Sequence, residues 1–259
     1  MILSCDIGNS SSSFGLFDEK GYDIIKAFRI DTAKISSSND LKKFFAKNNP
    51  LKDISGVSIS SVVPSIDPIY KDFFGKIKID PFYISSKIKL NIHICLESAE
   101  KLGSDRIANV SYAFFSKQKF QIIIDSGTAL TIDVIDGKGY FLGGVIFPGL
   151  PALAGSLYQS TEKLPIVEIN KANIEKAHII GTNTESSILS GIYFGYIFLL
   201  EGFIDNICDY YNRTVENTDI VITGGNSGLV ADAVKTKYAK TFDELWTLKG
   251  IKYLYDLNN

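Results

Sequence analysis

The sequence of 259 residues has little cysteine and no block of like charges. Its three cysteines, Cys5, Cys95 and Cys208, lie far apart and form no C-x-x-C pair, which argues against a disulfide scaffold or a zinc site and fits a reducing compartment. Basic residues (27) nearly balance acidic residues (29), and the net charge of −2 gives no sign of a nucleic-acid partner. The pattern G-x-x-x-x-G-K-[ST] is also absent, which disfavours a P-loop kinase.

Segments with the pattern of a membrane anchor or a leader are equally scarce. The N-terminus enters a strand pattern directly, without the basic and apolar regions of a signal peptide. The most apolar long stretch, residues 188–207, is interrupted by Gly191, Glu201 and Asp205, among others. This favours a buried helix over a membrane span. We therefore expect a soluble, cytoplasmic protein with no membrane partner.

One pattern opens each half of the sequence. An apolar strand ends in an aspartate, a turn of small residues follows, and a second strand begins; Asp6 ends the first such strand and Asp125 the second. A third strand follows in both halves, over residues 22–30 and 139–146. Such an internal repeat predicts a duplicated α/β fold.

The rest of the pattern adds helices to both halves. Hydrophobic spacing predicts helices over residues 39–47, 64–74, 107–115, 150–159, 184–212 and 246–257. Further strands are expected over residues 56–61, 81–85 and 219–223, whereas residues 87–96 are ambiguous. We expect domains over residues 1–117 and 118–259, with the last helix packed on the second. The hydrophobic fraction of 45% suffices for a sizeable core.

The first turn is rich in groups that can hold phosphate. Gly8 can adopt a positive φ and expose its amide, and Asn9 and four consecutive serines supply further donors. A ligand-free hairpin turn is the alternative, although a tight turn needs far fewer hydroxyls.

Three other short segments allow both a functional and a structural interpretation. Asp105 and Arg106, after Gly103 at a helix start, either supply ordinary first-turn charge or activate a hydroxyl and hold a carboxylate. Thr184 begins the longest helix, where hydroxyls either cap the helix or bind an anion. A Gly-Gly pair, residues 224–225, follows a strand and is either a plain loop or a place of close approach to a flat ligand. The lone histidine on an alternating stretch, His93, is expected to be structural.

Taken in order, six motifs resemble those of one enzyme family. They are D-x-G-N-S from residue 6, G-x-D-R from 103, D-x-G-T-A-x-T-x-D from 125, G-G-x-I-x-P-G from 143, N-T-x-x-S from 183 and T-G-G from 223. Together they resemble the type III pantothenate kinases of the acetate and sugar kinase, heat-shock ATPase and actin superfamily. The resemblance covers nearly the whole chain. It implies two ribonuclease H-like domains, each a mixed five-stranded sheet with flanking helices.

The same resemblance implies an activity and a set of cofactors. Such enzymes transfer the γ-phosphoryl group of ATP to the 4′-hydroxyl of pantothenate, the first step of coenzyme A biosynthesis. They use Mg²⁺ with ATP and a monovalent cation, K⁺ or NH₄⁺, and are typically homodimers. Phosphoryl transfer depends mostly on positioning and charge neutralisation, which suits the hydroxyls, glycine amides and carboxylates of these motifs.

Residue roles follow from the matched motifs only. The ATP-binding set is Asp6, Ile7, Gly8, Asn9, Ser10, Ser11, Ser12, Ser13, Thr128, Gly224 and Gly225, with Asp6 holding Mg²⁺ through water. Asp125 would ligate the monovalent cation. The pantothenate-binding set is Gly103, Ser104, Asp105, Arg106 and Thr184, with Asp105 as general base, Arg106 paired to the carboxylate, and Thr184 contributed by the partner subunit.

Two departures from the family pattern and two alternative functions remain. Ser10 replaces the usual Thr, and residues 96–99 read Leu-Glu-Ser-Ala where the family often has Tyr-x-x-Pro.

The alternative functions are another small-molecule kinase of the superfamily and a catalytically idle regulatory homologue. The carboxylate expected opposite Arg106 favours pantothenate over a sugar, and retention of Asp6, Asp105 and Asp125 argues against an idle protein.

Overall fold

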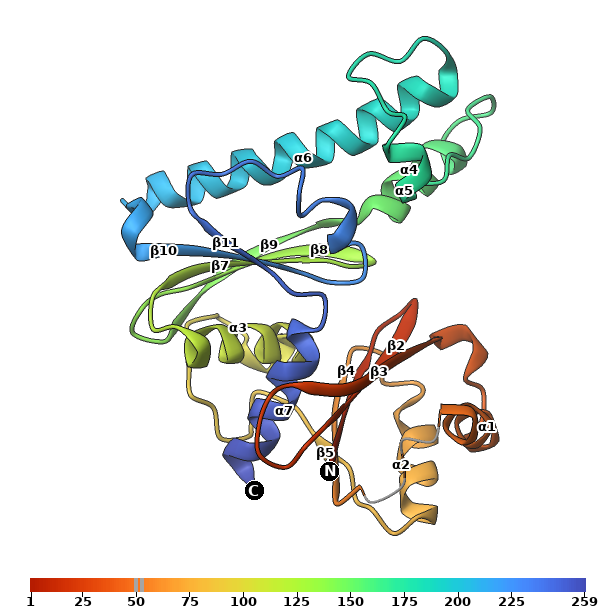
Figure 1. Ribbon diagram of the computed structural model, residues 1–259, viewed down its shortest axis with the longest axis vertical. Coiled ribbons are helices and arrows are strands. Elements are labelled where there is room, and N and C mark those ends of the chain that lie inside the picture. The colour runs from red at the N-terminus through yellow and green to blue at the C-terminus, as the bar shows by residue number, and fades with distance from the viewer. Residues whose placement is uncertain (49–50, 52–53) are drawn as a thin grey trace. The chain divides into compact units, whose positions relative to one another are not determined.

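The computed structural model describes residues 1–48, 51 and 54–259, which form two compact units. Unit 1 comprises Met1–Gln118, Lys138–Leu142 and Leu245–Asn259, and unit 2 comprises Lys119–Gly137 and Gly143–Glu244. The predicted cut between residues 117 and 118 stays a prediction. Each unit contains a mixed sheet with flanking helices (Figure 1).

The sheet of unit 1 has five strands in the order β3-β2-β1-β4-β5. β1 pairs antiparallel with β2 and parallel with β4, which places the carboxyl ends of β1 and β4 at one edge. The strands are β1 (Ile2–Ile7), β2 (Ser11–Phe17), β3 (Ile24–Asp31), β4 (Gly56–Ser61) and β5 (Phe82–Tyr83). Apolar residues of β1 and β4 are fully buried, because helices cover both faces of the sheet.

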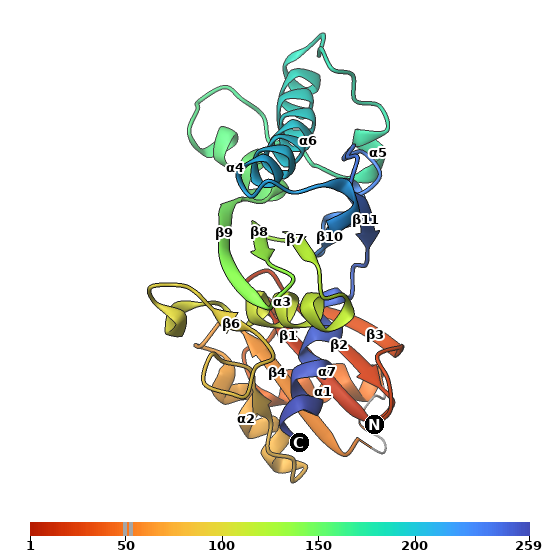
Figure 2. The same cartoon turned by 90° about the vertical axis from the view of Figure 1, so that its left-hand side faces the viewer.

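Helices α1 (Ser38–Asn48) and α2 (Asp67–Lys76) lie side by side in unit 1 (Figures 1 and 2). Their core is an aromatic cluster in which the ring of Phe14 lies 5.1 Å from Phe45 and 5.4 Å from Phe28. α3 (Ser104–Ser116) and α7 (Trp246–Asn258) pack against each other and against the same sheet.

The position of α7 corrects one expectation. A final helix was predicted correctly, but it packs within unit 1 and not on the second domain. Trp246 Nε1 donates a hydrogen bond to the carbonyl of Asn109 in α3, at 3.1 Å, and Gly250 allows close approach to the carbonyl of Ala108. These contacts depend on tertiary packing, which the amphipathic pattern of the helix cannot specify.

The second sheet repeats the strand order of the first. Its order is β11-β10-β7-β8-β9-β6, so β9-β8-β7-β10-β11 corresponds to β3-β2-β1-β4-β5. The strands are β6 (His93–Ile94), β7 (Phe120–Ser126), β8 (Ala129–Ile135), β9 (Tyr140–Pro148), β10 (Thr218–Thr223) and β11 (Ala239–Phe242). The predicted duplication is confirmed.

Two strands of this sheet were not predicted. β6 comes from the ambiguous stretch of residues 87–96 and adds a sixth strand, where five were expected, by pairing with Tyr140–Phe141 of β9. β11 consists of largely exposed residues, Ala-Lys-Thr-Phe, and lacks the apolar run that marks a strand.

Helix α6 (Thr184–Tyr210) runs along one side of the unit 2 sheet, near α4 (Leu150–Gln159) and α5 (Lys171–Ile174) (Figure 1). Among the described residues it is the one helix whose length and composition would allow it to cross a membrane, and half of its most apolar window is buried within the protein. Short 3₁₀ helices occupy Thr32–Lys34, Ala99–Lys101, Val215–Asn217 and Ser227–Leu229.

Candidate active site

In unit 1, the predicted phosphate turn and the predicted substrate segment lie at the same sheet edge. Asp6, near the end of β1, is aligned with Ser60 of the parallel strand β4. Ser60 Oγ lies 2.9 Å from Ser104 Oγ, and Ser104 also donates to the carbonyl of Ser61 at 3.1 Å. Since Ser104 is the first residue of α3, these bonds bring Asp105 to the carboxyl end of the strands, where ligands of α/β folds bind.

The turn between β1 and β2 is held by Thr32, which sequence reasoning missed. Thr32 Oγ1 donates to the carbonyl of Gly8 at 2.7 Å and lies 3.1 Å from Ser12 Oγ, and its backbone N–H donates to the carbonyl of Ser10. The N–H of Gly8 closes the turn onto the carbonyl of Ser11 at 3.1 Å. Thus one serine hydroxyl of this turn stabilises the turn itself.

The remaining members of the turn differ in exposure. Asn9 and Ser10 are exposed, whereas Ser12 is fully buried. Ser13 Oγ accepts a hydrogen bond from Arg29 Nε at 3.1 Å. Asp6 is half-buried. A ligand would therefore meet the tip of the turn, Asn9 and Ser10, before the buried hydroxyl.

Asp105 is held in one orientation at the start of α3. Its Oδ1 accepts a hydrogen bond from the backbone N–H of Arg106 at 2.7 Å. Burial raises the pKa of Asp105 above its ordinary value, and the hydrogen bond and charge of Arg106 oppose that rise only in part. A carboxylate that resists ionisation is a stronger base than an exposed one, which suits proton abstraction.

Arg106 contacts an aromatic ring from a distant part of the chain. Its guanidinium carbon lies 5.6 Å from the centre of the Phe141 ring, a cation–π distance. Phe141 lies on β9 and is fully buried. No signal in the sequence connects Phe141 with residues 103–106, because only the fold brings them together.

In unit 2, Asp125 and the Gly-Gly segment also meet. Asp125 of β7 is aligned with Thr223, the last residue of the parallel strand β10. Gly224 follows with a φ of +98°, and a Cβ there would strike the Asp125 carboxylate and the backbone of Ser126. Gly224 therefore lies close to protein atoms, and the expected approach of a flat ligand at residues 224–225 stays a prediction.

The turn after Asp125 is braced from two sides. The Asn226 side chain donates to the carbonyl of Gly127 at 3.1 Å, and its backbone N–H donates to Ser126. The N–H of Gly149, from the G-G-x-I-x-P-G motif, donates to the carbonyl of Thr128 at 3.1 Å. Thr128 itself is exposed.

Thr184 is the first residue of α6 in unit 2. Asn183 and Ser186 form the capping box of that helix, so the cap is Asn183 and not the Thr184 hydroxyl. Thr184 is exposed.

Metal-binding side chains are sparse. Across residues 1–48, 51 and 54–259, no group of three or more His, Cys, Asp or Glu side chains could hold a metal ion. Mg²⁺ commonly keeps several waters and binds through one or two carboxylates plus substrate phosphates, so a single carboxylate such as Asp6 fits Mg²⁺ that is bound to a nucleotide.

His93 is exposed and stacks on Tyr140 with ring centres 5.0 Å apart, in keeping with a structural role.

Comparison with known proteins gives a consistent result. The sequence model of the family described as type III pantothenate kinase matches residues 2–206. A protein of that name from Koribacter versatilis is 32% identical over 272 residues, covering 100% of this chain and 96% of the other. One from Desulforapulum autotrophicum is 35% identical over 263 residues, covering 99% and 97%.

Solved structures that are similar support the fold. A ROK family glucokinase from Streptomyces griseus, in complex with glucose and AMPPNP, has a TM-score of 0.55 at 13% identity, covering 99% of this chain and 98% of that one. The activator of the 2-hydroxyisocaproyl-CoA dehydratase from Clostridium difficile, with bound ADPNP, has a TM-score of 0.54 at 14% identity, covering 99% and 95%. The predicted duplicated ribonuclease H-like fold is in agreement with both.

Proposed function

The chain belongs to the type III pantothenate kinase family, and from this we infer that it transfers the γ-phosphoryl group of ATP to the 4′-hydroxyl of pantothenate, starting coenzyme A biosynthesis. The observation that carries this function on the chain itself is the pair Asp105 and Arg106, fixed at the start of α3 beside the end of β1. The Asp105 side chain can act as a base, and the Arg106 side chain can bind a carboxylate.

Asp105 is proposed as the general base. The carboxylate would accept the proton of the attacking hydroxyl, and its raised pKa brings it closer to the working pH than an exposed aspartate. In a loose transition state the proton leaves late, so orientation matters as much as basicity. The hydrogen bond from the N–H of Arg106 supplies that orientation.

Arg106 is proposed to bind the pantothenate carboxylate. A guanidinium offers a planar fork of donors that matches both carboxylate oxygens. The Phe141 ring beneath it limits the directions in which the fork can point. Gly103 and Ser104 would line the same substrate position, and Thr184 of the partner subunit would complete it.

The nucleotide and its metal are assigned to the two aspartate turns. Asp6 would hold Mg²⁺ through water, and residues 6–13 would contact the ATP phosphates. Thr128 is assigned to ATP binding by its own motif. Gly224 and Gly225 would approach the adenine. The metal held near Asp6 would supply positive charge that offsets the negative charge developing during transfer.

A monovalent cation, K⁺ or NH₄⁺, is assigned to Asp125. The carboxylate is half-buried and lies where a Cβ at Gly224 would come. It can supply oxygen ligands and one negative charge to such a cation. We also place the enzyme in the cytoplasm, where its three free cysteines would stay reduced.

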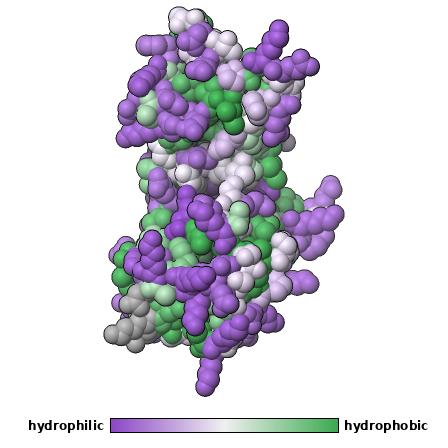
Figure 3. Space-filling model, turned by 90° about the vertical axis from the view of Figure 1, so that its right-hand side faces the viewer, coloured by the Kyte–Doolittle hydropathy of each residue, from purple (hydrophilic) through white to green (hydrophobic). Residues whose placement is uncertain are grey.

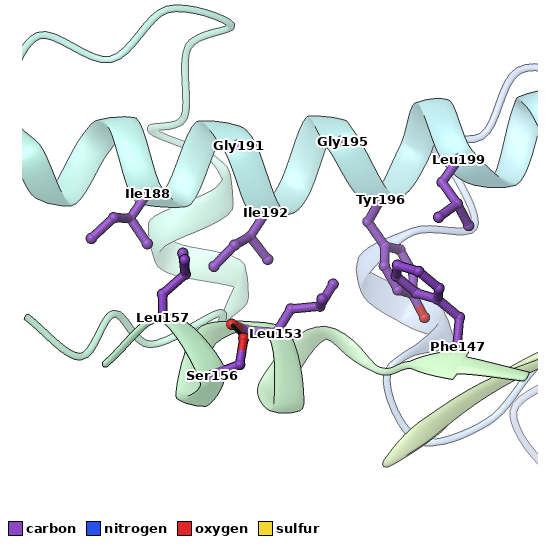
Figure 4. A pocket seen from close by; sticks show the side chains of 10 residues that line it. All are labelled: Phe147, Leu153, Ser156, Leu157, Ile188, Gly191, Ile192, Gly195, Tyr196 and Leu199. Atoms are coloured by element: carbon purple, nitrogen blue, oxygen red, sulfur yellow. Dashed lines mark hydrogen bonds between the residues drawn. The ribbon is translucent and has the colours of Figure 1, made fainter. Parts of the chain in front are cut away.

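We propose that a second copy of the chain covers the apolar groove of unit 2. The groove has a volume of about 340 Å³ and lies between α4 and α6. Figure 4 shows Ile188 and Ile192 of α6 directed toward Leu153 and Leu157 of α4, and Tyr196 and Phe147 line the same groove. Figure 3 shows apolar residues interspersed with polar ones over the face that it presents.

Mass measurement in solution tests the homodimer. Phe198 is 57% exposed on α6, the helix that lines the groove, so a lysine there would place a charge beside the proposed contact. Phe198→Lys should convert the dimer to a monomer in light scattering after size exclusion. Ile25→Lys, a matched change on β3 at the same 57% exposure, should leave the mass unchanged. A wild-type monomer at assay concentration would contradict the dimer.

A direct assay tests the activity. Purified protein with ATP, Mg²⁺, K⁺ and pantothenate should form ADP and 4′-phosphopantothenate in equal amounts, detected by mass spectrometry and a coupled ADP assay. Sugars offered in place of pantothenate should give no phosphorylated product. Absence of phosphopantothenate at every substrate concentration would favour the idle regulatory homologue, and turnover of a sugar alone would favour another kinase of the superfamily.

A further inference from the structure

We propose that the hydroxyl of Thr223 is a ligand of the monovalent cation, so that the ion is held by oxygens from two neighbouring strands, β7 and β10. The proposal rests on the proposed function, which assigns that cation to Asp125. It adds a second protein ligand. Thr223 lies in the T-G-G motif, but no role was assigned to this threonine from the sequence.

The register of the sheet places the two side chains together. Asp125 and Thr223 are the last aligned pair of the parallel strands β7 and β10. Aligned residues of adjacent strands project to the same face, and such strands lie about 4.8 Å apart. One ion can therefore contact both the carboxylate and the hydroxyl. Gly224, next in the chain, has no side chain, and the Asp125 carboxylate lies where a Cβ at that position would come.

The condition of the Thr223 hydroxyl points to a missing partner. Thr223 is completely buried, and its Oγ1 has no hydrogen-bond partner among the described residues. In unit 2, all of whose residues are described, it is the only buried hydroxyl in this condition. Buried hydroxyls nearly always have a partner, because an unpartnered one costs free energy. A bound cation would use the lone pairs of this oxygen.

The hydroxyl on the other side of Asp125 is already engaged. Thr131 of β8 is the antiparallel neighbour of Asp125, and its Oγ1 donates to Asp133 Oδ2 at 3.5 Å. The two threonines that flank Asp125 thus differ: the Thr131 hydroxyl has a protein partner, and the Thr223 hydroxyl has none among the described residues. A neutral hydroxyl adds an oxygen without adding charge, which keeps the pair suited to K⁺ and NH₄⁺.

Cation-dependent melting tests the proposal without relying on turnover. The wild type, Thr223→Val and Thr223→Ser are melted with Mg²⁺ and ATP but no pantothenate, in KCl or in tetramethylammonium chloride at equal ionic strength. Binding to the folded state raises the melting temperature of the wild type as K⁺ increases. For Thr223→Val, the K⁺ concentration that produces a given rise in melting temperature should be about tenfold higher or more than for the wild type. Thr223→Ser should return this concentration to the wild-type value.

The melting temperatures in tetramethylammonium chloride, without K⁺, give a second test of the proposal. There Thr223→Val should melt at or above the wild-type temperature, because it removes a buried hydroxyl that lacks a partner. Ser111→Ala, which removes another such hydroxyl in α3 of unit 1, is the matched control and should leave the K⁺ dependence unchanged.

The outcomes separate this proposal from the one on which it rests. If Asp125→Asn abolishes the K⁺ response while Thr223→Val keeps the wild-type response, the Asp125 site stands and the role of Thr223 is overturned. If the wild type itself does not respond to K⁺ in melting or in activity, both are overturned. A response lost in both variants and regained in Thr223→Ser supports both.

Discussion

A methyl group on the α-carbon of Gly103 would lie 2.5 Å from Oδ1 of Asp105. The backbone at Gly103 has φ −57° and ψ 139°, which any residue can adopt, so the glycine is needed for space and not for an unusual conformation. The observed orientation of the Asp105 carboxylate therefore requires that residue 103 has no side chain.

Gly103→Ala should therefore act on catalysis through Asp105. The carboxylate must rotate, losing the 2.7 Å hydrogen bond from Arg106, and a misplacement of this kind can lower kcat by about 100-fold. In an Asp105→Asn background the same change should cost little more, as the two act as a unit. Gly75→Ala, at a glycine with open space around it in α2, is the control and should keep full activity. Equal losses in both backgrounds would separate Gly103 from Asp105.

Asp105→Asn should lower kcat by about 10² to 10⁴-fold and leave the fold intact. Burial raises the pKa of Asp105 above its ordinary 3.8, so between that value and the raised one the folded state binds more protons than the unfolded state. The stability that this group contributes is present at acid pH and is lost as the pH rises through the raised pKa. At neutral pH the variant should then unfold at the same or a higher urea concentration than the wild type, and the difference should vanish below pH 3.8.

The pH profile of the wild type offers an independent check. Its kcat/KM should fall on the acid side with a pKa above 3.8, because protonated Asp105 cannot accept the proton of the hydroxyl. An unshifted acid limb in Asp105→Asn, with near-normal turnover, would remove this residue as the base.

Arg106 and Phe141 should determine affinity for the carboxylate of the substrate. Arg106→Lys loses the planar fork, and a charged hydrogen bond of about 1.5 to 3 kcal/mol corresponds to a rise in KM for pantothenate of about 10- to 150-fold. Phe141→Leu removes the ring beneath the guanidinium and should raise KM by a few-fold, with kcat unchanged.

Pantothenol, in which an alcohol replaces the carboxylate, is the matched substrate for these variants. It should be a poor substrate for the wild type, and neither substitution should weaken it further. A KM for pantothenol that rises in parallel with that for pantothenate would show that the variants disturb the site in general.

The repeat of strand, aspartate and small-residue turn was readable from the sequence because burial on both faces leaves an unbroken apolar run such as residues 122–124. The helices were readable as well, although α2 begins at residue 67 where 64 was predicted and α3 at residue 104 where 107 was predicted. β11 and β6 were not, since both are short and poorly buried edge strands that gain their structure from a neighbour.

The candidate site, like the fold, was only partly predictable from the sequence. The aspartates and glycines stand in local patterns, but their supports do not: Thr32 holds the first turn, Ser60 holds the start of α3, and Phe141 contacts Arg106. Each support is far in sequence from the residue it holds. Their pairing is decided by sheet register and crossover, which a single sequence does not encode in any short pattern.

Gly224→Ala should destabilise unit 2 and disturb the cation response together. A φ of +98° costs an alanine about 1 to 2 kcal/mol, and its Cβ would also press on the Asp125 carboxylate and on Ser126. We expect a lower urea midpoint and a K⁺ requirement for activity that shifts to higher concentration. Gly155→Ala in α4, where nothing lies near the added methyl group, should instead leave both unchanged or raise stability slightly, since alanine favours the helix. Loss of stability with an unaltered K⁺ requirement would mean that Gly224 serves the turn alone, and that Asp125 can bind the cation from a second orientation.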